Sequence, residues 1–481
     1  MENFKDKFLS GIFYTGLSRY IGIFVSLGIT AILARILTPH DFGIVAIATV
    51  FINFFSTLTT VGVSPAIVQN KEINESDLES INTFILIVAV ILTGLYILVV
   101  PVISHYYGSQ VLETVLYWLS INIFFSVLAI VPNALFLKNK RFKFIAVRSL
   151  VIQIILGCIS VIAAYVGMGI YSLIINPIGN SVLLYIISNH VYRVRMGAIN
   201  STSLSKIFSF SFFQMLYNLV YLGYRNIDKI LIGKYMGTSN LGYYEKSYRL
   251  MMLPLENVST VISPVLHPML SDYQKDFQYL WSVYKKMISF LSEFSFLVSV
   301  ILYYLADLII IGLYGDKWFD AIPIFKVLSL SVCFQLLQSP IGAILQAANS
   351  VKTLLKCSIW IFLFMVLGLI IAIIFVNFNM IPYMVDIVFI IGFIIYQISL
   401  SNIFKESIYD ILRIMVPHMF YSVLLFVLLY GVTLLSNSIW IDACLIMVTS
   451  FVYIFILFSI NQMPNIKKFV LESVNTFKSK I

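Results

Sequence analysis

The chain has 481 residues, of which 60% are hydrophobic and only 11% are charged, and its mean hydropathy is +0.96. A soluble domain carries about 25% charged residues, so this composition excludes a water-exposed globular protein and predicts an all-α integral membrane protein. The formal net charge is +9. Because basic residues of membrane proteins concentrate in cytoplasmic loops, this charge predicts no nucleic-acid partner.

Fourteen runs of about 20 mostly apolar residues, the length that crosses a bilayer, follow one another along the chain. They cover 9–36, 42–68, 81–103, 111–137, 144–166, 169–192, 207–235, 241–270, 287–313, 321–349, 354–376, 381–402, 413–435 and 438–461. The sequence therefore predicts about fourteen transmembrane helices, with the bilayer as their solvent.

Basic residues set the direction of the spans. Of the 31 Lys and Arg, 21 lie on the side that holds the two termini and six of the connections, and only three lie on the other side. This asymmetry predicts that both termini are cytoplasmic. The connections on the opposite side are all short, which leaves no room there for an external catalytic domain.

An internal repeat relates two parts of the chain. The segments 35–43 and 234–242 superpose at a shift of 199 residues, and the same shift carries Ser64-Pro65 onto Ser263-Pro264. Six spans separate the copies, so both halves have the same orientation, as in several transporter folds. Chance resemblance between apolar segments is the alternative.

The repeat predicts two parallel six-helix lobes around a central cavity, followed by two further helices. The predicted domains are an N-lobe at 1–200, a C-lobe at 201–404, and a last helix pair with a cytoplasmic tail at 405–481. Proline residues in the second, sixth and eighth spans are expected to break those helices and to act as bending points for alternating access.

Polar side chains recur with helical spacing on the spans that the repeat relates. They include Asn53, Thr57, Thr60 and Ser64 in the second span, and Gln214, Asn218, Tyr221, Arg225 and Asp228 in the seventh. Two interpretations stay open, namely ordinary packing of membrane helices through small and hydroxylated residues, and the lining of a substrate path.

Charged residues deep in a bilayer are costly and mark functional sites. The basic ones are Arg19, Arg225, Lys229, Lys246 and Arg249, and the acidic ones are Asp228, Glu245 and Glu256. By spacing, Arg225 can pair with Asp228 and Glu245 with Arg249, which would serve structure alone. The basic residues exceed the acidic ones by two, so we expect a positively charged cleft that binds phosphate.

Other acidic residues are secondary candidates. Glu293 in the ninth span is either a proton or cation site or a side chain solvated by the cytosol. A solvated outer rim is expected from Asp307, Asp316, Asp320, Asp386 and Asp442. No motif predicts a metal ion, a cofactor or catalytic residues.

Several motifs resemble those of the polysaccharide-transporter (Wzx-type) flippases, a family of the multidrug/oligosaccharidyl-lipid/polysaccharide exporter superfamily. They are Leu37-Thr-Pro-His-Asp-Phe-Gly43, Gly62-Val-Ser-Pro-Ala-Ile-Val-Gln69, Arg225-Asn-Ile-Asp-Lys-Ile-Leu-Ile-Gly233 and Ser263-Pro-Val-Leu-His-Pro-Met-Leu-Ser271. The resemblance is close over spans 1–2 and 7–8, and it rests on the helix pattern elsewhere.

The resemblance implies a transporter rather than an enzyme. Its substrate would be an undecaprenyl-pyrophosphate-linked oligosaccharide, moved across the bacterial inner membrane for O-antigen, capsule or exopolysaccharide assembly. The family's cavity arginines would correspond to Arg19, Arg225 and Arg249. We expect a monomer in the lipid bilayer, with a glycan polymerase and other assembly proteins as further candidate partners.

Three other functions remain as alternatives. A multidrug exporter of the same superfamily would want an acidic cavity, which the excess of basic residues disfavours. A membrane-embedded glycan polymerase or ligase is disfavoured by the short outer connections. A scaffold for a glycan assembly complex would leave the buried charges unexplained.

Overall fold

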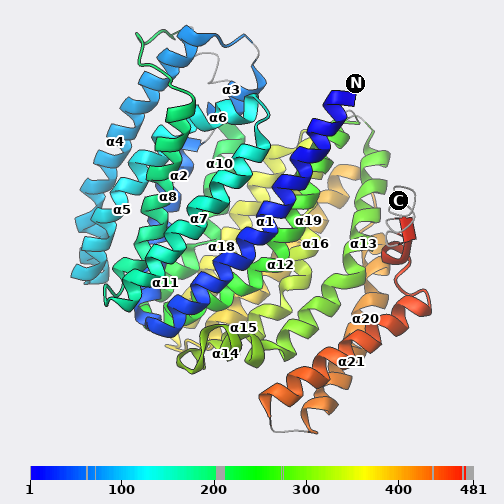
Figure 1. Ribbon diagram of the computed structural model, residues 1–481. Helices are drawn as coiled ribbons and strands as arrows, with labels where there is room; N and C mark the ends of the chain where they lie inside the picture. The colour runs from blue at the N-terminus through cyan, green and yellow to red at the C-terminus, as the bar shows by residue number, and fades with distance from the viewer. Residues whose placement is uncertain are drawn as a thin grey trace. The chain divides into compact units, whose positions relative to one another are not determined.

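The computed structural model describes residues 2–60, 63–70, 72–201, 212–271, 273–274, 276–435, 438–468 and 471–472, and the regular elements in these ranges are helices (Figure 1). The chain divides into two compact units, Met1–Gly242 and Tyr243–Ile481.

The first unit holds ten helices within its described residues and the start of an eleventh. These are α1 (Glu2–Ile36), α2 (Pro39–Thr60), α3 (Val63–Gln69), α4 (Glu75–Tyr107), α5 (Gln110–Leu128), α6 (Ile130–Lys138), α7 (Phe142–Tyr165), α8 (Tyr171–Val191), α10 (Phe212–Tyr224), α11 (Ile227–Tyr235) and the first residues of α12 (Thr238–Ser271).

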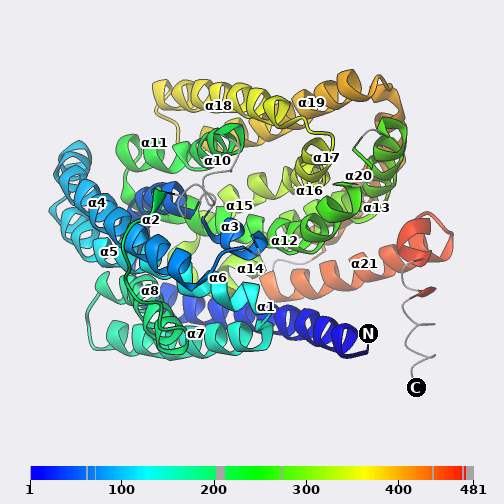
Figure 2. The same ribbon diagram turned by 90° about the horizontal axis from the view of Figure 1, so that it is seen from above.

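Small residues bring the helices of this unit into close contact. Helix α1 lies along α7, and α5 packs between α4 and α8 (Figures 1 and 2). A Cβ atom on Gly157 of α7 would lie 1.9 Å from Cδ1 of Ile29, so the helices approach closely where the glycine has no side chain. The Gln153 amide donates to the Gly22 carbonyl at 2.8 Å and ties α7 to α1 a second time.

The second unit contains the remainder of α12 and the C-terminal half of the chain. Its other elements are α13 (Phe277–Tyr304), α14 (Ala306–Tyr314), the 3₁₀ turn η1 (Asp316–Trp318), α15 (Ala321–Leu330), α16 (Val332–Gln338), α17 (Ile341–Ala347), α18 (Val351–Ile374), α19 (Met380–Phe404), α20 (Ile408–Thr433) and α21 (Ile439–Ser459).

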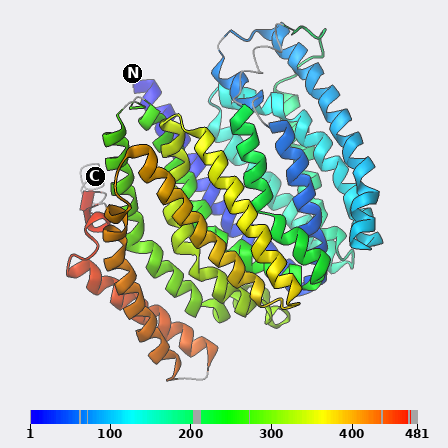
Figure 3. The same ribbon diagram turned by 180° about the vertical axis from the view of Figure 1, so that it is seen from behind.

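Long antiparallel contacts organise this unit as well. Helices α18 and α19 run side by side, as the yellow and gold ribbons of Figure 3 show. Helix α13 packs against both α16 and α20. A buried apolar cluster then joins α13, α20 and α21 through Leu297, Leu425 and Ile446, so the last two helices are attached to the rest of the unit by hydrophobic burial.

All fourteen predicted spans coincide with helices where they are described, but the count of fourteen is not confirmed. Among the described residues, eleven helices are long and apolar enough to cross a membrane, or twelve if the bent pair at 321–347 is one span. The seventh predicted span consists of the two short helices α10 and α11, and the eighth, α12, carries four charged residues. The spans that fail the test are thus two of those that carry the candidate charged residues.

Several spans are interrupted, though not always where proline predicts. The fourth span breaks at Ala129, where Pro132 cannot donate a hydrogen bond to Leu128 four residues earlier. The tenth span bends by 45° at Ser331. In contrast, α8 continues through Pro177, and α12 is a single helix despite its prolines, so the expected breaks in these two helices are wrong.

The two copies of the repeated motif contact one another inside the first unit. A Cβ atom on Gly43 would lie 1.8 Å from the Thr238 carbonyl oxygen, and one on Gly242 would lie 2.0 Å from the Pro39 carbonyl oxygen. Thr238 follows Pro39 by 199 residues (238 − 39), and Gly242 follows Gly43 by 199 (242 − 43). The contact is therefore reciprocal, as expected for two segments related by a local two-fold axis.

Candidate functional site

Helix α10 carries the candidate Tyr221, ends directly before the candidate Arg225, and contacts α2, which carries Asn53. The Arg225 Nε atom lies 3.4 Å from the Tyr221 hydroxyl oxygen, and its guanidinium carbon lies 5.7 Å from the centre of that ring. Tyr221 is 38% exposed and Asn53 is exposed, so these polar groups remain accessible in the first unit. Asn218, one turn before Tyr221, is half-buried.

The chain turns between α10 and α11, and this turn places two further candidates. Asp228, in the first turn of α11, is only 1% exposed, and its Oδ1 accepts the Lys229 backbone N–H at 2.8 Å. A carboxylate at this position also faces the positive end of the helix dipole. Asp228 is therefore held at the helix N-terminus, while Lys229 is half-buried beside it.

Arg19 lies half-buried on α1, the helix that α7 covers. The side chains of the candidates Thr60 and Gln214 lie outside the part of the chain that the structure describes.

In the second unit, α12 presents an ion pair that the spacing did not predict. Arg249 Nη1 lies 3.3 Å from Glu256 Oε1, two helical turns along, whereas the sequence pattern paired Arg249 with Glu245. Their side chains are 54% and 39% exposed. Because a charged pair is unstable against lipid hydrocarbon, this exposed face of α12 is suited to water or to a polar ligand.

The N-terminal part of α12 is held rigidly against the segment that follows α14. Ser247 donates to the Ala321 carbonyl at 2.9 Å, and the rings of Tyr243 and Trp318 meet edge to face. Lys246 lies 6.0 Å from the centre of the buried Tyr314 ring. Glu245, its neighbour, is half-buried. This packing fixes the helix that carries Arg249.

Glu293 anchors the C-terminal segment. It is 2% exposed in α13, and its carboxylate accepts the backbone N–H groups of Asn465 at 3.0 Å and Ile466 at 2.8 Å. The Asn465 side-chain amide donates to the same carboxylate and to Ser289. A short helical segment begins at Pro464, so Glu293 satisfies the free N–H groups of a helix start. The alternative that Glu293 is solvated by the cytosol is therefore wrong.

One buried basic residue, Arg148, was not among the candidates predicted from the sequence. Arg148 in α7 is 6% exposed and donates to Ser188 Oγ at 2.6 Å and to Asn133 Oδ1 at 2.9 Å, with its guanidinium 5.1 Å from the centre of the Phe136 ring. Both hydrogen-bond acceptors are neutral. An arginine inside a predicted span is unusual, and this alone would have marked Arg148 as a candidate.

The expected solvated rim of aspartates is wrong in part. Asp386 in α19 is only 7% exposed, and its Oδ1 has no hydrogen-bond partner among the described residues. Asp307 pairs with Lys326 at 2.6 Å, and both line a cavity that also contains Asp442. Asp316 and Asp320 are exposed, as expected.

The structure thus brings some candidates together within each unit. Tyr221 and Arg225 are joined in the first unit, and Arg249 and Glu256 in the second. The cleft between the halves stays a prediction.

The fold and its charged helices define a multi-pass membrane protein built like a transporter. The structure resembles lipid II flippase MurJ in an inward closed conformation, with a TM-score of 0.72 and 16% sequence identity, over 94% of this chain and 99% of that one. At this identity the likeness shows a shared fold.

The chain belongs to the family of polysaccharide biosynthesis proteins, whose model matches residues 32–323. An uncharacterised membrane protein in the cps region of Klebsiella pneumoniae is 24% identical over 66% of this chain. The match covers 66% of that protein, which is just under two thirds of its length. The lipopolysaccharide biosynthesis protein WzxC of Escherichia coli is 21% identical, over 74% of this chain and 73% of that protein.

Proposed function

We propose that the protein is a flippase that moves undecaprenyl-pyrophosphate-linked oligosaccharide repeat units across the bacterial cytoplasmic membrane. The units would then be assembled into O-antigen, capsule or exopolysaccharide. Membership of the polysaccharide biosynthesis family supports a role in glycan assembly. The fold shared with a lipid II flippase supports the transport of a lipid-linked sugar.

One observation carries the proposal, namely the Arg249–Glu256 pair on the exposed face of α12. A helix within the bilayer does not keep an arginine exposed unless that face meets water or a polar substrate. The planar guanidinium forms paired hydrogen bonds to phosphate oxygens, so Arg249 suits a pyrophosphate group. Arg225 beside Tyr221 offers the same chemistry in the first unit.

Transport would proceed by alternating access between the two halves. Arg19, Arg225, Lys229, Lys246 and Arg249 would attract the pyrophosphate, while Asn53, Gln214, Asn218 and Tyr221 would contact polar parts of the substrate. Asp228, Glu245, Glu256 and Glu293 would pair with the basic residues or couple transport to an ion. Both termini would be cytoplasmic, and the protein would act as a monomer alongside the glycan polymerase.

The excess of basic over acidic residues on these helices disfavours a multidrug exporter, whose cationic substrates require negative charge. The connections on the predicted outer side are short, such as residues 37–38 between α1 and α2 and 108–109 between α4 and α5. They leave no place for the acceptor site of a polymerase or ligase.

Deletion of the gene, followed by analysis of lipid-linked intermediates, tests the proposal. Without the flippase, undecaprenyl-linked repeat units are expected to stay on the cytoplasmic leaflet. A glycan-modifying enzyme added outside spheroplasts then cannot reach them. Units that reach the outer leaflet and fail only to polymerise would contradict the proposal and support a polymerase.

A further inference from the structure

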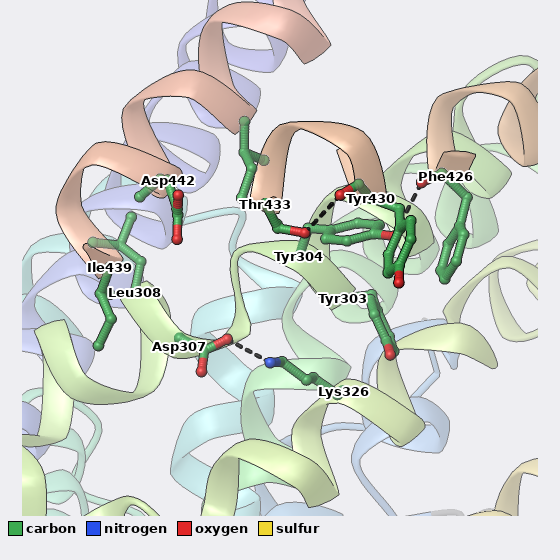
Figure 4. A pocket seen from close by; sticks show the side chains of 12 residues that line it. Tyr303, Tyr304, Asp307, Leu308, Lys326, Phe426, Tyr430, Thr433, Ile439 and Asp442 are labelled. Carbon is green, nitrogen blue, oxygen red and sulfur yellow. Dashed lines mark hydrogen bonds and ion pairs between the residues drawn. The ribbon is translucent and has the colours of Figure 1, made fainter. Parts of the chain in front are cut away.

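A cavity of about 500 Å³ lies in the second unit, between the ends of α13 and α20 and the starts of α14 and α21 (Figure 4). This volume is within the range of sites that bind small molecules or head groups. No residue that lines it belongs to the candidate substrate site described above.

The charges in this cavity do not balance. Lys326 Nζ lies 2.6 Å from Asp307 Oδ2, so these two residues neutralise one another. Asp442 also lines the cavity, and its Oδ1 is buried without a hydrogen-bond partner among the described residues. A buried carboxylate oxygen without a partner is unfavourable by about 1–3 kcal/mol. The cavity therefore has an excess of one negative charge and one unused acceptor.

Asp442 lies in the first turn of α21, but capping of this helix does not use its Oδ1 atom. Carboxylates are favoured there by the helix dipole, and many accept a backbone N–H group. Asp442 Oδ1 accepts none of these N–H groups. Within the described residues this acceptor therefore stays available to a ligand.

Aromatic rings form the adjoining wall of the cavity, as Figure 4 shows. The centres of the Tyr303 and Tyr304 rings lie 5.4 and 5.0 Å from that of Phe426. The Tyr304 hydroxyl donates to the Phe426 carbonyl at 3.0 Å, which fixes its ring. Ring faces attract cations such as ammonium groups, and a nearby carboxylate adds a negative charge that favours the same ligand.

The cavity lies at one edge of the membrane domain. Helix α20 ends at Thr433 and α21 begins at Ile439, and both residues line the cavity. Tyr430 and Ile439 are 58% and 39% exposed, so the cavity is open to its surroundings on this side. Ends of spanning helices lie at the level of lipid head groups. Amines are present there both in phospholipids and in the adjoining water.

We propose that this cavity binds a primary ammonium group, which pairs with Asp442 and packs against the tyrosine rings. The group would be carried by an ethanolamine phospholipid or by a soluble amine. The site is independent of the proposed transport function, because it is defined by Asp442, Tyr303 and Tyr304 alone.

Thermal unfolding of the purified full-length chain in nanodiscs tests the proposal and separates the two sources. Discs of phosphatidylglycerol alone are compared with a series of discs in which phosphatidylethanolamine replaces increasing shares of that lipid, up to half. Ethanolamine hydrochloride is titrated separately into the discs of phosphatidylglycerol, with sodium chloride as the ionic-strength control. A saturable rise in the unfolding midpoint with the lipid alone assigns the site to a head group, and one with ethanolamine assigns it to a soluble amine.

Asp442→Asn keeps the shape of the side chain and removes its charge, so it is expected to weaken the apparent affinity at least about tenfold. Asp316→Asn, an exposed aspartate outside the cavity, is the matched control and should respond like the unmodified chain. Tyr303→Leu removes one aromatic wall and gives a second readout should Asp442→Asn fold poorly. An equal response of Asp442→Asn and Asp316→Asn, or no response to either amine, would overturn the proposal.

Discussion

Gly43 lies against the backbone of Thr238 so closely that a Cβ atom on the glycine would sit 1.8 Å from the Thr238 carbonyl oxygen. Thr238 is the residue that the 199-residue repeat superposes on Pro39, which in turn faces Gly242 in the same way. The starts of α2 and α12 thus cross by using two equivalent glycines. Any side chain at either position would force the two helices apart.

Gly43→Ala and Gly242→Ala are each expected to lower the free energy of unfolding by about 1–3 kcal/mol, because the clash is with backbone that cannot rotate away. Thermal unfolding in detergent measures the change. Gly94→Ala is the matched control, since nothing lies within 4 Å of a Cβ atom there and α4 should be slightly stabilised. Equal stability of all three variants would rule out the tight crossing.

Glu293→Gln is expected to release the C-terminal segment. In the variant, an amide nitrogen replaces one carboxylate oxygen and faces the backbone N–H group of Asn465 or Ile466, so two donors oppose one another. The protein thereby loses a charge-assisted hydrogen bond worth about 1.5–3 kcal/mol. Trypsin should then cleave faster after Lys467 and Lys468.

Glu472→Gln provides the control for this experiment, because its contact with Lys468 at 3.9 Å is exposed and contributes little. The result also separates the anchoring role of Glu293 from an ion-coupling role. Loss of transport by Glu293→Gln with unchanged cleavage of the tail would favour ion coupling.

Much of the fold could be predicted from apolar runs and loop charges alone, since the bilayer permits only helices for such segments. The positions of breaks could not. Pro132 interrupts a helix while Pro177 does not. A proline leaves the carbonyl four residues earlier without its helical donor, and neighbouring groups decide whether the helix can continue past it. Sequence spacing contains no information on such neighbours.

The sequence predicted which helices carry the candidate site, but it did not predict which charged residues pair with one another. Spacing favoured Glu245 as the partner of Arg249, yet the structure pairs Arg249 with Glu256. Long side chains can span two turns along one face, so i, i+4 spacing does not decide between partners. Asp442 was expected to be solvated, because nothing in the sequence indicated that α14 and α20 would enclose it.

Arg148→Ala is expected to destabilise the first unit by about 2–4 kcal/mol. The change removes two hydrogen bonds and the packing on Phe136, and it leaves the Asn133 and Ser188 acceptors in α6 and α8 without this donor. Arg141→Ala, which removes an exposed guanidinium 5.5 Å from the Tyr192 ring, should cost no more than about 1 kcal/mol. Thermal unfolding of the two variants distinguishes a buried structural arginine from one with no such role.

Arg249→Ala is expected to abolish transport while the protein still inserts and stays folded. The Arg249–Glu256 pair is exposed, and exposed ion pairs contribute only about 0–1 kcal/mol, so unfolding would not explain a loss of activity. Arg249→Lys should give partial activity, because lysine keeps the charge without the planar fork. Complementation of a deletion strain measures transport, and membrane immunoblots measure insertion.

Lys285→Ala is the matched control, since Lys285 forms a similar pair with Asp410 at 3.2 Å but lies on α13 and not on the helix that carries Arg249. It should complement fully. Arg225→Ala is expected to behave like Arg249→Ala, because its guanidinium stands beside the accessible Tyr221 hydroxyl. If both arginine variants complement as well as Lys285→Ala, neither arginine binds the pyrophosphate. A flippase would then have to hold that group through other residues, and the location of the lipid-linked intermediates would decide whether it transports them at all.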